Sequence, residues 1–160
     1  IVPQHLWSPQ SALDRERHVV AASLQMPIFF VQRDGEVGIQ AVDAAGGLYS
    51  QLIDGDKEAQ LGGKATTVIR IQWPGYLPWH EQKHTKSDGR KRQPVTVGKL
   101  ATLVGASVDH FFQVRGKLVD PDSDQLQWRI GGQGGITCHD VTIIGLVQVS
   151  AGGWMALLRV

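Results

Sequence analysis

Apolar and polar residues alternate most regularly between Thr66 and Trp73. A period of two is typical of a β-strand with one buried face. The predicted buried side holds large apolar residues and the opposite side is mixed: Ile69, Ile71 and Trp73 against Val68, Arg70 and Gln72. The following Trp73-Pro74-Gly75-Tyr76 sequence predicts a turn, because proline cannot donate to the ladder and glycine permits the reversal.

A helical period of apolar residues runs from Pro94 to about Val114. Thr96 is suited to cap the helix, so we expect an amphipathic helix over about 96–114. Its apolar stripe is expected to pack in the core, with a ligand groove or a partner face as the alternatives: Leu100, Val104, Val108 and Phe111. Small residues on the same helix would let it lie close against a sheet: Gly98, Ala101, Gly105 and Ala106.

The N-terminal third predicts an arm, a helix and a hairpin. Residues 1–7 are expected to lay Leu6 and Trp7 on the body of the protein. Ser8-Pro9 is a typical helix start and predicts a short helix to about Ser23. Its apolar side would carry Leu13, Val20 and Leu24. The Asp34-Gly35 turn signal predicts a hairpin over Met26–Val42, and the loop 43–63 is expected to hold one short element around Leu48–Ile53.

The C-terminal third predicts strands separated by glycine-rich joints. Leu126–Ile130 has the pattern of a short strand, and a flexible joint follows at Gly131–Gly135. Val141–Val149 and Trp154–Val160 are apolar runs joined by a turn at Ser150–Gly153, which predicts two paired interior strands.

Together these elements predict an α+β fold in a single domain spanning residues 1–160. We expect a mostly antiparallel sheet of about five to seven strands, with the long helix packed on one face and a short N-terminal helix.

Composition narrows the classes of partner. The 160 residues carry a formal net charge of +1, so attraction to a polyanion would have to come from local clusters. No run approaches the roughly 18 apolar residues of a membrane span, so we expect no membrane partner. Cys138 is the single cysteine, which excludes an intramolecular disulfide and favours a reducing, cytoplasmic or nuclear, compartment.

A zinc-hydrolase motif, His80-Glu81-Gln82-Lys83-His84, lies after the turn. On a helix the two histidines would share one face and one Zn²⁺, and Glu81 would act as base on the metal-bound water. Pro78 and Asp88-Gly89 leave room for only about two helical turns. A third ligand would have to come from later in the chain: Asp109, His110, His139 or Asp140. Surface histidines without a metal or cofactor are favoured, and a zinc-dependent hydrolase is the alternative.

A basic cluster overlaps this motif. It holds five positive side chains against a single Asp88: Lys83, Lys86, Arg90, Lys91 and Arg92. Tyr76 and Trp79 stand nearby and could stack on a partner. We interpret the exposed 74–93 turn and loop as a partner-binding surface, for a protein or for nucleic acid, with a merely solvated loop as the alternative.

Three further patterns in the sequence are weaker indications of a functional site. Cys138-His139 is interpreted as inert, because adjacent residues on a strand point to opposite faces, and the alternative is that they pair as nucleophile and base in a loop. Asp120, Asp122 and Asp124 begin like an EF-hand, but Gln125 and Gly131 replace the required glycine and glutamate. The strand-rich, tryptophan-containing composition also suits a carbohydrate-binding module, although no residue pattern specifies one.

Several motifs resemble those of an uncharacterised protein family of mushroom-forming fungi. They are Trp73-Pro74-Gly75-Tyr76, Pro94-Val95-Thr96 with Lys99-Leu100-Ala101, the Phe111-Phe112 pair, and Ser150 followed by Gly153-Trp154. The resemblance covers roughly Ile69 to the C-terminus and implies a fungal source and a shared fold, without an activity. The function predicted from the sequence is therefore that of a non-enzymatic interaction domain.

Overall fold

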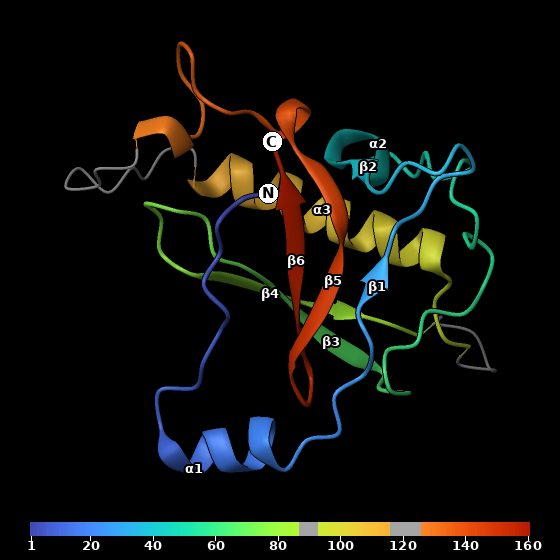
Figure 1. Ribbon diagram of the computed structural model, residues 1–160, viewed down its shortest axis with the longest axis vertical. Coiled ribbons are helices and arrows are strands. Elements are labelled where there is room, and N and C mark those ends of the chain that lie inside the picture. Colours follow the sequence, from blue (N-terminus) through green and yellow to red (C-terminus); the bar gives the residue numbers. More distant parts are fainter. Residues whose placement is uncertain (87–92, 116–125) are drawn as a thin grey trace.

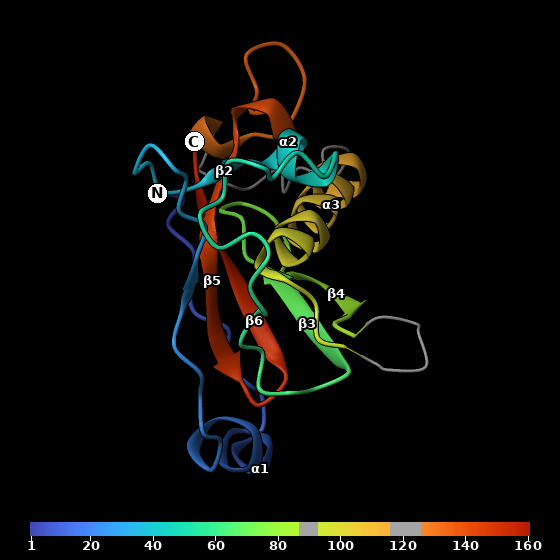
Figure 2. The same cartoon turned by 90° about the vertical axis from the view of Figure 1, so that its right-hand side faces the viewer.

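A six-stranded mixed sheet with α2 and α3 on one face forms the frame of the computed structural model (Figures 1 and 2), which describes residues 1–86, 93–115 and 126–160. The strands lie in the order β1-β5-β6-β3-β4, and β2 also pairs with β5. Only the β3–β6 pair is parallel among these pairs. The predicted α+β fold, with a mostly antiparallel sheet and one long helix, is confirmed.

The elements follow one another along the chain within these bounds: α1 (Ala12–Arg15), a π-helical turn (Glu16–Val20), β1 (Ile28–Phe29), β2 (Ile39–Gln40), α2 (Ala41–Ala45), β3 (Thr66–Ile71), β4 (Trp79–His84), α3 (Val97–Arg115), 3₁₀ turns at Leu126–Trp128 and Cys138–Asp140, β5 (Thr142–Ser150) and β6 (Gly153–Arg159). No helix of the described residues has the length and apolar character needed to cross a membrane.

The centre of the fold agrees with the sequence pattern. On β3, Ile69 and Ile71 are fully buried, and Trp73 continues the buried side beyond the strand. The indole Nε1 of Trp73 donates a hydrogen bond of 2.7 Å to the carbonyl of Trp128. Gly75 adopts a φ of 80°, and the amide of Tyr76 donates to the carbonyl of Trp73, which closes the predicted turn.

Helix α3 buries the predicted stripe completely: Leu100, Val104, Val108 and Phe111. Thr96 caps it, its Oγ1 accepting a 3.2 Å hydrogen bond from the amide of Lys99. The two glycines among the small residues make room for a different part of the protein from the predicted one. A Cβ on Gly98 would run into the ring of Tyr49, and a Cβ on Gly105 would run into the α2 backbone. They therefore admit Tyr49 and α2 rather than the sheet (Figure 2).

The predicted pair of C-terminal strands is confirmed, since β5 and β6 are antiparallel neighbours. The predicted Met26–Val42 hairpin forms only at its tip, where the amide of Gly38 donates to the carbonyl of Phe30 and the amide of Gln32 to that of Glu36. A turn does occur at Gly35 and a bridge joins Val31 to Val37, but β1 and β2 each pair with β5. Strand β5 is long enough to pair with both short strands. A two-stranded hairpin of this length is only marginally stable, so pairing with β5 is favoured.

Three other predicted elements differ from the structure. The N-terminal helix is short, is capped by Ser11 instead of Ser8, and buries no side chain. Leu13 and Val20 on its predicted apolar side are 59% and 62% exposed, because little of the body faces them. The short element expected at Leu48–Ile53 occurs earlier, as α2. Leu126–Ile130 opens with a 3₁₀ turn instead of a strand.

The N-terminal arm lies along β6, where β6 and β3 diverge (Figure 1). Gln4 bridges the two strands, donating from Nε2 to the carbonyl of Ala156 at 2.7 Å and accepting from the amide of Gln72 at 2.9 Å. Val2 is buried, whereas Leu6 is exposed. Trp7 does reach the body, so the prediction for the arm holds for Trp7 and is wrong for Leu6.

Candidate functional site

The predicted site residues 80–84 lie on β4, the terminal strand of the sheet. Arg70 pairs with His80, Ile69 with Glu81 and Thr66 with His84, all antiparallel. Side chains alternate along this strand: His80, Gln82 and His84 are exposed, while Trp79, Glu81 and Lys83 are half-buried.

This strand removes the helical geometry on which the zinc motif depends. Four residues of a strand span about 13 Å, whereas two histidines on one zinc ion must each approach it to about 2 Å. His80 and His84 therefore lie about 13 Å apart along the strand instead of on successive helical turns, and Glu81 points to the opposite face. Residues 79–84 pair with β3 and so do not form the short helix for which the sequence leaves room after Pro78. Among the described residues no group of three or more His, Cys, Asp or Glu side chains is placed to hold a metal.

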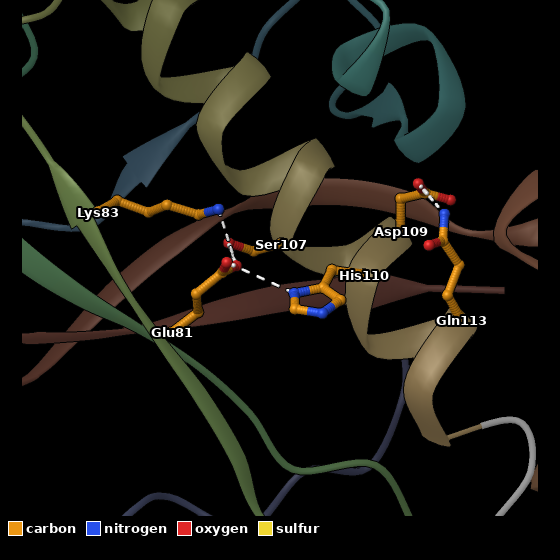
Figure 3. Close-up of polar contacts among 6 residues, drawn as sticks. All are labelled: Glu81, Lys83, Ser107, Asp109, His110 and Gln113. Carbon is orange, nitrogen blue, oxygen red and sulfur yellow. Dashed lines mark hydrogen bonds and ion pairs between the residues drawn. The ribbon is translucent and has the colours of Figure 1, made fainter.

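On the inner face, Glu81 is the centre of a polar cluster between β4 and α3 (Figure 3). Its Oε2 accepts a 2.9 Å hydrogen bond from the hydroxyl of Ser107 and lies 2.7 Å from the Nζ of Lys83. Its Oε1 lies 3.4 Å from the Nδ1 of His110. Ser107 is fully buried, so this carboxylate supplies a partner to a hydroxyl that water does not reach.

The electrostatics of the cluster keep Glu81 ionised. Burial acts to raise its pKa, but hydrogen bonds from Lys83 and Ser107, the charge of Lys83 and the contact with His110 outweigh burial and lower the pKa below its ordinary value. Ser107 and His110 bind the same carboxylate instead of each other. The cluster consequently lacks a serine held by a basic histidine, and its chemistry is that of a link between α3 and β4.

The aromatic residues predicted to bind a partner, Tyr76 and Trp79, pack against the core. The hydroxyl of Tyr76 accepts a 2.9 Å hydrogen bond from the amide of Ile130. The ring of Trp79 lies 5.9 Å from that of Phe111 and 5.7 Å from that of His110, centroid to centroid. Both rings are half-buried, and their contact with a partner stays a prediction.

The basic cluster is only partly within the described residues. Lys83 is 16% exposed and paired with Glu81, and Lys86 forms an isolated antiparallel bridge with Pro94. Arg90, Lys91 and Arg92 lie outside the described residues, as do Asp120, Asp122 and Asp124. The structure thus brings Lys83 into the Glu81 cluster and leaves the rest of the predicted basic surface as a prediction.

Cys138 lies in a 3₁₀ turn behind α3. Burial raises the pKa of its thiol to about 12, and the neighbouring Asp109 carboxylate adds to the shift. His139 and Asp140 share the turn, where Asp140 Oδ2 accepts hydrogen bonds from the amide and the hydroxyl of Thr137. A thiol with this pKa is protonated at neutral pH, which suits an inert cysteine.

The feature that the sequence analysis missed is the open backbone edge of β4. The amide of Thr85 donates to the carbonyl of Ala65, so Thr85 belongs to the residues that face β3. Because facing alternates along an antiparallel strand, His80, Gln82 and His84 turn their N–H and C=O groups away from β3. Within the described part of the chain no strand pairs with that side. The run of polar residues after Pro78 was an available signal, since charge and proline are typical of edge strands.

Comparisons of this chain with protein-family models, with curated proteins and with solved structures found no match.

Proposed function

We propose that this domain is an interaction module that binds an extended, acidic segment of a protein partner as an additional strand on β4. The observation that carries the proposal is the position of β4 at the end of the sheet, with the backbone groups of alternate residues directed outward. Strand addition draws its affinity from such main-chain hydrogen bonds and its specificity from the side chains beside them.

The length and rigidity of the edge support strand addition. Strand β4 pairs with β3 along all six of its residues. The Glu81 cluster ties the inner face of the strand to α3. A partner would therefore meet a backbone that is already extended, which reduces the ordering cost of binding.

The charge beside the edge favours an acidic partner. The positive side chains beside the edge are Arg70, on the outer face, and Lys86, which follows the strand. The only acidic side chain of β4 is Glu81, which lies on the inner face and is already paired with Lys83. Complementary charge would speed association and make the affinity fall as salt rises.

A proline substitution tests the edge directly. Gln82→Pro removes an outward N–H without removing a hydrogen bond to β3, and proline is tolerated on strands whose N–H faces solvent. Displayed peptides of about six to eight residues, the length of an ordinary strand, are selected on the wild-type domain. We expect acidic sequences whose affinity falls by about tenfold or more in Gln82→Pro.

Gln82→Ala is the matched control, because it shortens the same side chain and keeps the N–H. It should bind within about twofold of the wild type, and in nuclear magnetic resonance spectra the amides of His80, Gln82 and His84 should shift on binding. Equal affinity for Gln82→Pro and Gln82→Ala would contradict the proposal. Selection of no acidic peptide, or salt-sensitive binding of an oligonucleotide in preference to the peptides, would also contradict it.

A further inference from the structure

A recess lies on the face of the sheet opposite α3. It is an open cleft of about 600 Å³ between the N-terminal arm, α1 and the chain on either side of the Trp73–Tyr76 turn. Figure 1 shows the arm descending from the N-terminus to α1. The volume falls within the range of about 300–1,000 Å³ that is usual for small-molecule sites.

One wall of the cleft is apolar and held in place. It consists of the indole of Trp7 with Pro9 and Pro78. The guanidinium carbon of Arg70 lies 3.9 Å from the ring centroid of Trp7 and occupies one face of the indole. Gln4 anchors the arm to Ala156 and Gln72, so the indole is fixed from the sheet side.

The remaining wall offers hydrogen-bonding groups that are not already used. The side chains of Gln10, His18 and Gln72 line the cleft and make no hydrogen bond with any described residue. Asp14 also lines it, and its Oδ2 accepts a 2.7 Å hydrogen bond from the hydroxyl of Ser11. Two amides, an imidazole and a carboxylate therefore line the same cleft as the apolar residues.

We propose that this cleft binds a neutral, hydroxyl-rich ring, namely a sugar residue of a saccharide. The C–H face of such a ring packs against indole and proline, while its hydroxyls take the donors and acceptors of the amides and the carboxylate. No lysine or arginine lines the cleft, which disfavours an anion. The cleft has a single aromatic ring, already stacked on Arg70, which disfavours a cation held by several rings.

Titration with a panel of neutral monosaccharides and disaccharides tests the proposal. Binding is followed through the indole N–H of Trp7 and the side-chain amides of Gln10 and Gln72 by nuclear magnetic resonance. These probes are needed because the chain has five tryptophans, which makes total fluorescence unspecific. We expect at least one saccharide to shift all three groups together, with a dissociation constant of about 1 mM or lower.

Substitutions then separate this cleft from a nonspecific effect. Trp7→Ala should weaken the best saccharide by about tenfold or more, and Gln72→Ala by about threefold or more. Gln40→Ala changes the same residue type at an exposed position on β2, outside the cleft, and should leave binding unchanged. If Trp7→Ala loosens the arm and fails to fold, Gln10→Ala and Gln72→Ala decide the question.

Tetramethylammonium and inorganic phosphate serve as competing probes and should leave the Trp7 signal in place. The proposal is overturned if no saccharide of the panel shifts Trp7, if either competing probe shifts it instead, or if Gln10→Ala and Gln72→Ala bind as well as Gln40→Ala. None of these outcomes bears on the β4 edge, because the cleft and the edge share no residue.

Discussion

Glu81 shows how one side chain can be misinterpreted when its secondary structure is unknown. Within the His80–His84 motif it resembles a catalytic base, but on β4 it joins Lys83 of its own strand to Ser107 and His110 of α3. Strand β4 and helix α3 meet through side chains and not through backbone hydrogen bonds. A charged group with buried partners therefore supplies orientation that apolar contacts alone do not.

Glu81→Gln should destabilise the protein in a pH-dependent way. The folded pKa of Glu81 lies below its ordinary value of 4.5. Its carboxylate therefore stabilises the fold above that value, and the contribution is lost as the pH falls through the folded pKa. We expect the variant to lose about 1 kcal/mol of unfolding free energy at about pH 7, and the loss to shrink as the pH falls through the folded pKa.

Urea unfolding at several pH values measures this difference. Glu36 is exposed and lies in the turn before β2, so Glu36→Gln is the control and should show no comparable pH trend. A Glu81→Gln difference that is independent of pH would show that the carboxylate charge is not what stabilises the α3–β4 contact.

At the scale of elements, α2 packs directly against α3 at Gly105. Glycine inside a helix ordinarily costs about 1 kcal/mol relative to alanine. At Gly105 an added Cβ would lie 2.8 Å from the carbonyl carbon of Ala44 and closer still to the amide nitrogen of Ala45. Both of these atoms belong to the backbone of α2, so rotation of a side chain cannot relieve the clash.

Gly105→Ala should therefore reverse the usual sign of a glycine-to-alanine change. We expect it to lower the unfolding free energy by about 1–3 kcal/mol, the usual cost of overpacking. Gly152→Ala is the control, because its Cβ would meet only the Nζ of Lys64 at an ordinary 3.6 Å. Thermal and denaturant unfolding of the two variants give the comparison, and a stabilised Gly105→Ala protein would mean that α2 is free to move away.

At the scale of the whole molecule, both ends of the chain enter one core. Val2 near the start and Leu158 near the end belong to the same cluster of buried apolar residues, which also contains α3 and the inner face of the sheet. Strand β6 lies between β5 and β3, so the C-terminal residues join the two halves of the sheet. The core therefore draws its residues from the whole length of the chain, from Val2 to Leu158.

Unfolding should consequently occur in one cooperative transition. Trp73 and Trp154 are buried in the core and report tertiary packing, whereas far-ultraviolet circular dichroism reports backbone structure. We expect the two denaturation curves to have the same midpoint, as for a two-state domain. Separate midpoints would show that part of the sheet unfolds independently of the core.

The sequence alone determined those features that depend on local periodicity. Alternation over Thr66–Trp73 and the helical stripe over Leu100–Phe111 identified which faces are buried, because each residue's side follows from its own backbone geometry. The Trp73–Tyr76 turn was equally local, since proline and glycine restrict the backbone wherever they occur. The fungal resemblance and the basic 90–92 cluster stay predictions.

The tertiary structure alone decided what depends on distant partners. Residues 80–84 satisfy a helical motif in sequence, yet the ladder offered by β3 makes them a strand and so separates the two histidines. Similarly, β1 and β2 each pair with β5 and not with each other. Glu81 meets Ser107 across 26 positions of chain, and no spacing rule anticipates that contact. Backbone pairing and burial of polar groups are non-local contributions to the free energy, and here they outweigh the local pattern.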